Sequence, residues 1–292
     1  MKIFEQRMGR ENKKHPAVML KDVLCEQSRH INKVTEEKYH LGSLLKPNAT
    51  LDPEGYGELH GRELIKIDAD FVRERELDFS GAKIPNVQAF YKSEYGAQTE
   101  DEIIVKWREN KSREKNGQME MAITVLLSQK LGKDFLVVRT APYDDYKNGV
   151  DNLILDCVTG EIVGAFDGVH EGGDGRRTEE KKSKIQKIAK RGGVEIRYGL
   201  KLVDGKLVRA SLKGVPVFYL GLESSELMEL VSGLNENDNK KTDKVFNELL
   251  ASLATQRTEL EKSASTQDFH KKLAFFGQSL SRLKDTIELK MA

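Results

Sequence analysis

Two aspartates flank an apolar stretch that has the pattern of a β-hairpin. Asp151 precedes the run NLIL and Asp167 follows the run IVGAF, with the turn sequence CVTGE between the two runs. A three-residue loop with Gly160 in the left-handed conformation would pair residue 157 with residue 161. The same register places Asp151 opposite Asp167, with both carboxylates on one face of the sheet. Because facing like charges destabilise a sheet, we expect a positive group between them.

A third carboxylate is predicted to reach the same place from the preceding helix. Glu120 lies on the same helical stripe as Ile123 and Leu127, so it should sit on the buried face near the start of that helix. A buried carboxylate needs a partner. Three converging acids offer the hard oxygen ligands that Mg²⁺ and Mn²⁺ prefer. We therefore predict that Glu120, Asp151 and Asp167 bind one of these ions.

The elements that must position these acids follow one another in an order typical of an α/β core. The patterns predict, in chain order, a helix over about 117–131, a buried strand over 134–140, the hairpin, a helix from N-cap Thr178 to Gly192-Gly193, two strands that turn at Asp204-Gly205, and a buried strand over 214–222. We expect an α/β fold, with a small mixed sheet flanked by helices, in a core domain of residues 111–234.

This order resembles the PD-(D/E)XK, or restriction-endonuclease-like, nuclease superfamily, in which a helix with Glu and a strand precede a hairpin with an acid on each strand. The resemblance covers about residues 115–202 and rests on a short, degenerate motif. It implies a restriction-endonuclease-like core in which Asp151 and Asp167 bind the metal, and the family's helix Glu falls on Glu120. The motif's lysine should follow the second acid by two residues, where this chain has Val169. That departure implies either an inactive site or a lysine supplied from elsewhere.

The next helix offers such a lysine. Lys181 and Lys182 precede Ile185 by four and three residues, and Ile185 and Ile188 mark the inner face of this helix. Either ammonium group could project back toward the aspartates and act as the catalytic lysine, and relocation of the lysine to this helix is known in the superfamily. The alternative is that the sequence KKSK is a solvated helix face.

Together these residues predict a metal-dependent nuclease. A phosphodiester repels hydroxide, so its hydrolysis needs charge neutralisation and an acidified water, and a metal held by carboxylates supplies both. From Glu171 to Lys213 there are thirteen Lys and Arg against six Asp and Glu, a net charge of +7 in a chain whose total is +1. We predict that Arg176, Arg177 and Lys184 contact phosphates, so that the partner is nucleic acid, with DNA favoured.

Two other functions remain open at this point. One is a catalytically inactive protein on the same fold that binds nucleic acid, with Val169 as the mark of a lost active site. The other is a scaffold protein whose working part is the C-terminal helices.

The flanks of the core have less distinct patterns. Residues 1–110, an N-terminal accessory region, predict a short helix beginning at Pro16 and a capping box at Thr99, and little else can be assigned there. Residues 235–292 begin with a linker composition and continue with a heptad stripe, which predicts a helical hairpin. The stripe consists of Phe269, Leu273, Phe276, Leu280, Leu283 and Ile287. The hairpin could pack on the core or form a homodimer.

Composition excludes several classes of protein. No stretch approaches the length of a membrane span, and the first residues lack the apolar core of a signal peptide, so we expect a cytoplasmic protein without a membrane partner. The two cysteines, Cys25 and Cys157, are far apart and lack the spacing of zinc ligands. Trp107 is expected in the core rather than on a base-stacking surface. Asp144 and Asp145 are expected to form a turn, with a contribution to metal binding as the alternative.

Overall fold

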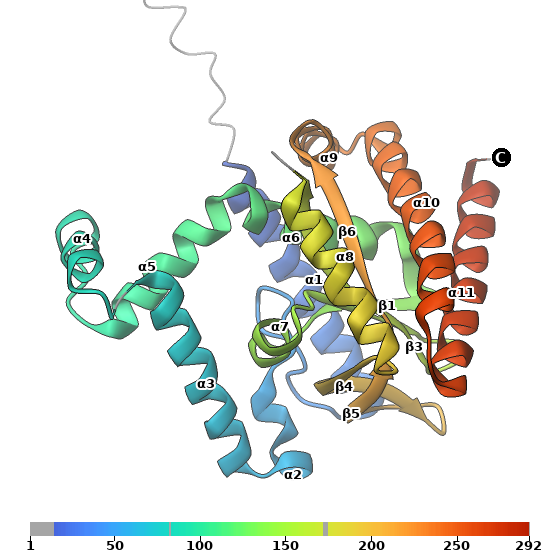
Figure 1. Ribbon diagram of the computed structural model, residues 1–292, viewed down its shortest axis with the longest axis horizontal. Helices are drawn as coiled ribbons and strands as arrows, with labels where there is room; N and C mark the ends of the chain where they lie inside the picture. Colours follow the sequence, from blue (N-terminus) through green and yellow to red (C-terminus); the bar gives the residue numbers. More distant parts are fainter. Residues whose placement is uncertain (1–14, 82, 172–174, 292) are drawn as a thin grey trace, which may run out of the picture.

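A four-stranded mixed sheet lies at the centre of the computed structural model, which describes residues 15–81, 83–171 and 175–291 (Figure 1). Side chains are described throughout these ranges except for residue 177 and residues 283–291. The sheet has the order β1-β2-β3-β6. Neighbouring strands are antiparallel, except that β3 and β6 are parallel. The strands are β1 Phe135–Arg139, β2 Asn152–Asp156, β3 Ile162–Glu171 and β6 Val217–Glu223. The predicted α/β fold with a mixed sheet is confirmed.

A separate two-stranded ribbon follows the helix after β3. Strands β4, Val194–Val203, and β5, Lys206–Val215, pair antiparallel and turn at Asp204 and Gly205. Both turn residues have positive φ, 50° and 72°, as a two-residue hairpin loop that matches the strand twist requires. The sequence predicted this turn correctly.

Helices cover both faces of the sheet. Helix α6 packs on β1 and β3, α8 and α10 pack on β6, and α11 packs on β3. The bounds of the helices in the second half of the chain are α6 Lys115–Leu131, α7 Pro142–Asn148, α8 Arg176–Lys190, α9 Ser224–Glu236, α10 Asn239–Ser263 and α11 Gln267–Met291. The order α6, β1, β2, β3, α8, β6 agrees with the order expected from the sequence, with the β4–β5 ribbon between α8 and β6.

Helix α8 begins earlier than predicted. Its N-cap is Gly175, with φ of 68°, and Thr178 lies inside the first turn, so the prediction of Thr178 as N-cap is wrong. A glycine reaches positive φ without steric cost, which suits it to the N-cap position here. The C-terminal end matches the prediction, because the N–H groups of Gly192 and Gly193 close the last turn.

The N-terminal region forms one helix on the core and an arm of helices beside it. Helix α1, Pro16–Tyr39, begins with the predicted proline and packs on α6. In Figure 1 the helices α3 to α5 extend away from the sheet. They share a small apolar cluster made of Leu77, Tyr91, Ala97, Ile103 and Ile104. The elements after α1 are η2 Pro53–Tyr56, α2 Gly57–His60, α3 Arg62–Ser80, α4 Pro85–Tyr95 and α5 Glu100–Arg113. The predicted capping box at Thr99 is present at the start of α5.

The C-terminal helices α10 and α11 form the predicted helical hairpin and pack on the sheet. The ring of Phe276 stacks on Phe218 of β6, with 3.9 Å between centroids. The side-chain amide of Gln256 donates to the carbonyl of Tyr219 at 2.8 Å and accepts its N–H at 3.0 Å, which covers part of the edge of β6. The described part of the heptad stripe is therefore buried within one chain, and the side chains of Leu283 and Ile287 lie outside the described residues. A homodimer through these helices stays a prediction.

Membrane spans were also sought among the helices. None within the described ranges combines the length and the apolar character that crossing a membrane needs.

Candidate active site

The turn end of the hairpin between β2 and β3 departs slightly from the predicted register. Leu153 pairs with Ala165, as predicted, but Leu155 pairs with Ile162 across an irregularity. Gly160 has φ of 82°, the left-handed conformation expected for the last residue of the loop. The turn chemistry was therefore predicted correctly, while the pairing nearest the turn is shifted by one residue.

The open end of the hairpin separates the two aspartates. Asn152 pairs with Phe166, yet the N–H of Asp151 also donates to the Phe166 carbonyl at 2.8 Å. Asp151 and Asn152 thus both oppose Phe166, as in a β-bulge. Such a shift of one residue in the register moves a side chain to the other face of the sheet. The Asp151 carboxylate accepts the N–H of Gly168 at 2.6 Å and lies on the face of β3 to which a Gly168 side chain would point, away from the Asp167 side chain. The two carboxylates therefore do not share a face as predicted, although the charge of Asp167 still helps to raise the pKa of Asp151.

Asp151 lines a cleft of about 670 Å³ together with Glu120 and Asp145. Glu120 comes from α6, as predicted, and its carboxylate forms an ion pair of 3.0 Å with Arg139 at the end of β1. A side chain at Gly168 would come within 3.1 Å of the Asp151 carboxylate and 3.8 Å of Glu120 Cγ. The absence of a side chain at Gly168 therefore allows α6 to approach β3 and brings Glu120 beside Asp151.

Burial and mutual repulsion disturb these carboxyl groups. Burial raises the pKa of Asp151 well above its ordinary value, and the charges of Glu120 and Asp145 raise it further, while the N–H of Gly168 opposes the shift. Burial likewise raises the pKa of Asp145 to about 6, with Glu120 adding repulsion and Lys111 opposing it. Each charged carboxylate makes ionisation of its neighbours more costly, as expected for like charges in a shared site.

Asp167 lies on the other side of β3, against α8. It is within the strand rather than at its end, because β3 continues to Glu171. Its carboxylate pairs with the ammonium group of Lys181, whereas Lys182 pairs with Glu179 at 2.9 Å on the helix surface. Burial raises the pKa of Asp167 even though the charge of Lys181 lowers it. Of the two lysines predicted to reach the aspartates, Lys181 does so.

Arg176 and Lys184, two of the residues predicted to bind phosphate, have different surroundings. Arg176 is exposed, with its Nε 4.0 Å from Glu180, and the side chain of Arg177 lies outside the described residues. Lys184 donates to the carbonyl of Asn148 at 2.8 Å. Burial, followed by repulsion from the Lys181 ammonium, lowers the pKa of Lys184. Lys184 therefore belongs with the Asp167 cluster, and its contact with phosphate stays a prediction.

Asp144 and Asp145 do not form the predicted turn. Both lie in α7, which begins at Pro142 and joins β1 to β2. Asp144 is fully buried and accepts the backbone N–H groups of Arg197 and Tyr198, each at 2.9 Å. Proline followed by acidic residues is a helix start signal, and it could have indicated α7 in the sequence. A helix at this place would also have put the side chains of the adjacent residues Asp144 and Asp145 on different faces.

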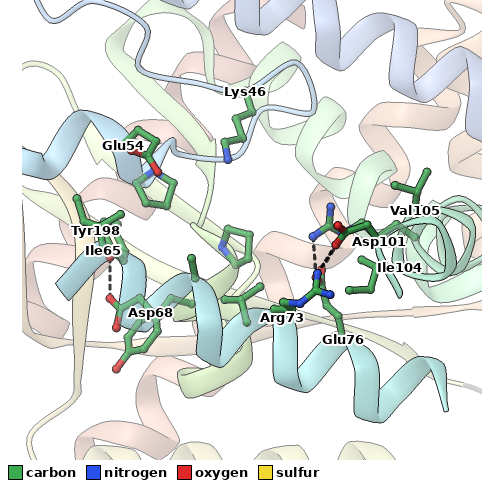
Figure 2. Close-up of a pocket in the computed structure, with 16 residues that line it drawn as sticks. Lys46, Glu54, Ile65, Asp68, Arg73, Glu76, Asp101, Ile104, Val105 and Tyr198 are labelled. Atoms are coloured by element: carbon green, nitrogen blue, oxygen red, sulfur yellow. Dashed lines mark hydrogen bonds and ion pairs between the residues drawn. The ribbon is translucent and has the colours of Figure 1, made fainter. Parts of the chain in front are cut away.

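A second cavity, of about 290 Å³, adjoins the cleft between α3, α5 and α7 (Figure 2). Five residues line both cavities, namely Lys46, Glu76, Val105, Arg108 and Pro142. Polar side chains around the second cavity bond one another within the arm and between the arm and the core. Tyr198 of β4 donates to Asp68 of α3 at 2.6 Å, and Arg73 of α3 bonds Asp101 of α5 in Figure 2. The first pair joins the arm of helices to the core and the second joins two helices of the arm, which are structural roles.

Trp107 matches its prediction as a core residue in part, because it packs against the small apolar cluster of the arm. It is half-buried, lines the cleft and stacks on Phe79 of α3. Lys111, one helical turn further along α5, lies 5.4 Å from the centre of the Trp107 ring. The spacing of four residues between Trp107 and Lys111 was visible in the sequence, but the position of α5 beside the cleft was not.

The chemistry of the cleft fits a divalent cation, because carboxylate oxygens are the ligands that Mg²⁺ and Mn²⁺ prefer. Within the described ranges, however, no three His, Cys, Asp or Glu side chains are placed to hold one ion. Glu120 is bonded to Arg139, and Asp167 is on the far side of β3. The residues that would hold a metal in the cleft are Asp145 and Asp151, joined by Glu120 once it leaves Arg139.

Comparisons of the chain with known protein families, with curated proteins and with solved structures find no match. A functional assignment therefore rests on the sequence motif and on the geometry of the cleft.

Proposed function

We propose that the chain is a metal-dependent nuclease that hydrolyses phosphodiester bonds of nucleic acid, with DNA favoured, in the cleft beside Asp151. One observation carries the proposal: Glu120, Asp145 and Asp151 are collected at one place in the cleft although the charge of Glu120 disfavours ionisation of both aspartates. A cleft with carboxyl groups of strongly raised pKa is a marker of functional sites. The order α6, β1, β2, β3, α8, β6 supports a restriction-endonuclease-like core.

The residues of the cleft suit the charge changes of phosphodiester hydrolysis. A bound Mg²⁺ or Mn²⁺ would polarise the scissile phosphate and lower the pKa of a bound water. Asp145 and Asp151 would hold that ion, and Lys111 and Arg139, which line the same cleft, would offset the negative charge of the phosphate. Lys111 already faces carboxylate charge, since it lowers the pKa of Asp145.

Lys181 stays our candidate for the relocated lysine of the motif. It contacts Asp167, the second acid, whereas Lys182 is held at the helix surface by Glu179. In this proposal Lys181 neutralises Asp167 on the face of β3 that points to α8. It thereby limits the negative charge next to the phosphate site on the opposite face. Asp167 is thereby assigned to support the site rather than to line the cleft.

A second candidate function is an inactive nuclease fold that binds nucleic acid. Val169, at the motif position where the superfamily has lysine, is buried in β3 with 4% of its surface exposed. Glu120 is already satisfied by Arg139. Both observations favour a site that binds a strand without cleaving it, and the experiment below separates the two candidates.

The test is a cleavage assay with Mg²⁺ or Mn²⁺ on labelled single-stranded and duplex DNA and RNA. Wild type is compared with Asp151→Asn, with Asp151→Asn/Asp167→Asn and with Asp134→Asn, a control at an exposed aspartate before β1. We expect Asp151→Asn to slow cleavage by at least about a hundredfold, the upper end of what loss of an outer-shell metal partner costs. The control should cleave like wild type.

Each other result of this assay has a definite meaning. Binding of the strand without cleavage by wild type would favour the inactive fold. Cleavage by Asp151→Asn at the wild-type rate would remove the cleft from the mechanism. Absence of both binding and cleavage would contradict both candidate functions.

A further inference from the structure

Three aromatic rings from three helices meet at the edge of the cleft. Trp107 of α5 and Phe79 of α3 stack with 6.3 Å between ring centroids and 12° between planes. Phe79 also lies 5.8 Å from Tyr146 of α7. The Phe79 ring is 61% exposed, although it belongs to a large apolar side chain. We call Phe79, Trp107 and Tyr146 the aromatic edge.

Positive charge accompanies the aromatic edge. The ammonium group of Lys111 lies 5.4 Å from the centre of the Trp107 ring and 5.9 Å from that of Tyr146. Trp107, Lys111 and Tyr146 all line the cleft. Lys111 thus lies beside two half-buried rings that extend to the exposed Phe79. A cation beside accessible aromatic rings is the combination that binds an anionic backbone together with its bases.

The aromatic edge is adjacent to the proposed catalytic carboxylates. Tyr146 follows Asp145 in α7, and the charge of Lys111 lowers the pKa of Asp145. A nucleic-acid strand bound with one phosphate near Asp145 and Asp151 would therefore place its neighbouring base beside Tyr146 and Trp107. The bases of a duplex are stacked and paired, so they offer no free face to these rings.

A second set of exposed aromatic residues on the same arm provides a contrast. Phe90 of α4 is 50% exposed and contacts the rings of Tyr91 and Tyr95. Phe79 stacks on Trp107, which lines the cleft, whereas neither Phe90 nor the two rings it contacts line either cavity described above. Phe90 matches Phe79 in residue type and exposure but not in position, and it serves as a control.

We infer that the aromatic edge, with Lys111, is a stacking site for an unpaired base, so that the substrate of the cleft is a single strand or an unpaired segment of DNA or RNA. The inference rests on the proposed function, whose substrate class it specifies. Each stacked base contributes about 1–3 kcal/mol by alanine substitution in other proteins, which is about a fivefold to a hundredfold change in affinity.

The chain supplies its own reporter, because Trp107 is the single tryptophan of the sequence. We would titrate wild type in EDTA, where no divalent ion supports cleavage, with a single-stranded oligonucleotide. The matched duplex and an oligonucleotide of the same length built of abasic residues are titrated in parallel. We expect the single strand to quench Trp107 emission, and the duplex and the abasic strand to leave it unchanged. Equal quenching by all three would overturn the inference.

Variants give an independent measure through the fluorescence anisotropy of a labelled oligonucleotide. Phe79→Ala should weaken binding of the single strand by about fivefold to a hundredfold and change binding of the abasic strand little. Phe90→Ala should bind the single strand like wild type. Because Phe79 is mostly exposed, its replacement is expected to preserve the fold, which a thermal melt would verify. Equal affinities of wild type and Phe79→Ala would overturn the stacking site.

The nuclease activity and the stacking site can be contradicted independently of each other. Quenching by the single strand in EDTA without cleavage in Mg²⁺ would leave the stacking site in place and remove the nuclease. Cleavage of duplex in Mg²⁺, with no quenching by the single strand, would keep the nuclease and overturn the stacking site.

Discussion

Asp144 and Asp145 are adjacent in α7, and burial raises the pKa of each to about 6, but their surroundings differ. Asp144 points to β4 and accepts the N–H groups of Arg197 and Tyr198. Asp145 points to the cleft, where Glu120 adds repulsion. One carboxylate is buried to hold a strand in place. The other is buried among like charges.

This comparison separates structural from functional acids more clearly than burial does. A buried carboxylate that satisfies backbone donors stabilises the fold, and removing it leaves those donors unpaired. A carboxylate beside other carboxylates raises the free energy of the folded state, and removing it relieves repulsion.

The two aspartates should respond oppositely to replacement by alanine. Asp144→Ala leaves two buried N–H groups of β4 without their acceptor and should lower the free energy of unfolding by about 3 kcal/mol. Asp145→Ala should leave it unchanged or raise it. Urea denaturation of the two variants and wild type at pH 7 measures both. Equal losses of stability in the two variants would contradict the comparison.

The pH dependence of stability should reveal the repulsion at Asp145. Its pKa of about 6 in the folded state exceeds the unfolded value of about 3.9, so the folded state holds the proton more tightly. The stability that this provides is present below about pH 4 and is lost as the pH rises through about 6, a change of about 3 kcal/mol.

Asp145→Asn should lack this part of the pH dependence, whereas Asp144 contributes in the same direction to both proteins. Unfolding free energies of wild type and Asp145→Asn would be compared between pH 4 and pH 7.5. If the unfolding free energies of the two proteins changed with pH in parallel, the carboxylate of Asp145 would not be destabilised by its neighbours.

Two neighbouring lysines of α8 offer a smaller test. Lys181→Met leaves buried Asp167 without its partner and should cost about 1 kcal/mol, a value reduced because Lys181 is partly exposed. Lys182→Met breaks a surface pair with Glu179 and should change stability by about 0.3 kcal/mol or less. Thermal melts of both variants distinguish them. A larger loss for Lys182→Met would mean that the sequence indicated the wrong lysine.

Hydrophobic periodicity was enough to predict most elements of the core. The hairpin, the helix with Glu120 and the strand 135–139 follow from alternating or helical patterns and from turn residues, which act locally. Contact between Lys181 and Asp167 also followed from helical spacing, within a choice of two lysines.

The details of the site could not be predicted in the same way. A β-bulge at Asp151 depends on how β3 pairs with β6 and how α6 packs, and no local pattern encodes that slip of one residue. The aromatic edge combines α3, α5 and α7, whose positions are set by ion pairs between distant segments such as Arg108 and Glu76. Sequence reasoning therefore found two acids of the cleft, Glu120 and Asp151. It favoured a turn for Asp145 and did not predict that Asp167 faces α8.

The central claim is that the cleft carboxylates serve a metal rather than the fold. It is tested most directly by melting wild type and Asp151→Asn with and without Mn²⁺. A metal at ten times its Kd that binds the folded state alone stabilises it by about 1.4 kcal/mol, which is about 3–5 °C for a chain of this size. We predict that rise for wild type in millimolar Mn²⁺. Asp151→Asn should lose most of the rise and melt without metal at the same temperature as wild type or higher, because repulsion with Glu120 and Asp145 is relieved. A variant that melts several degrees lower without metal, together with a wild type that ignores Mn²⁺, would show that Asp151 is structural.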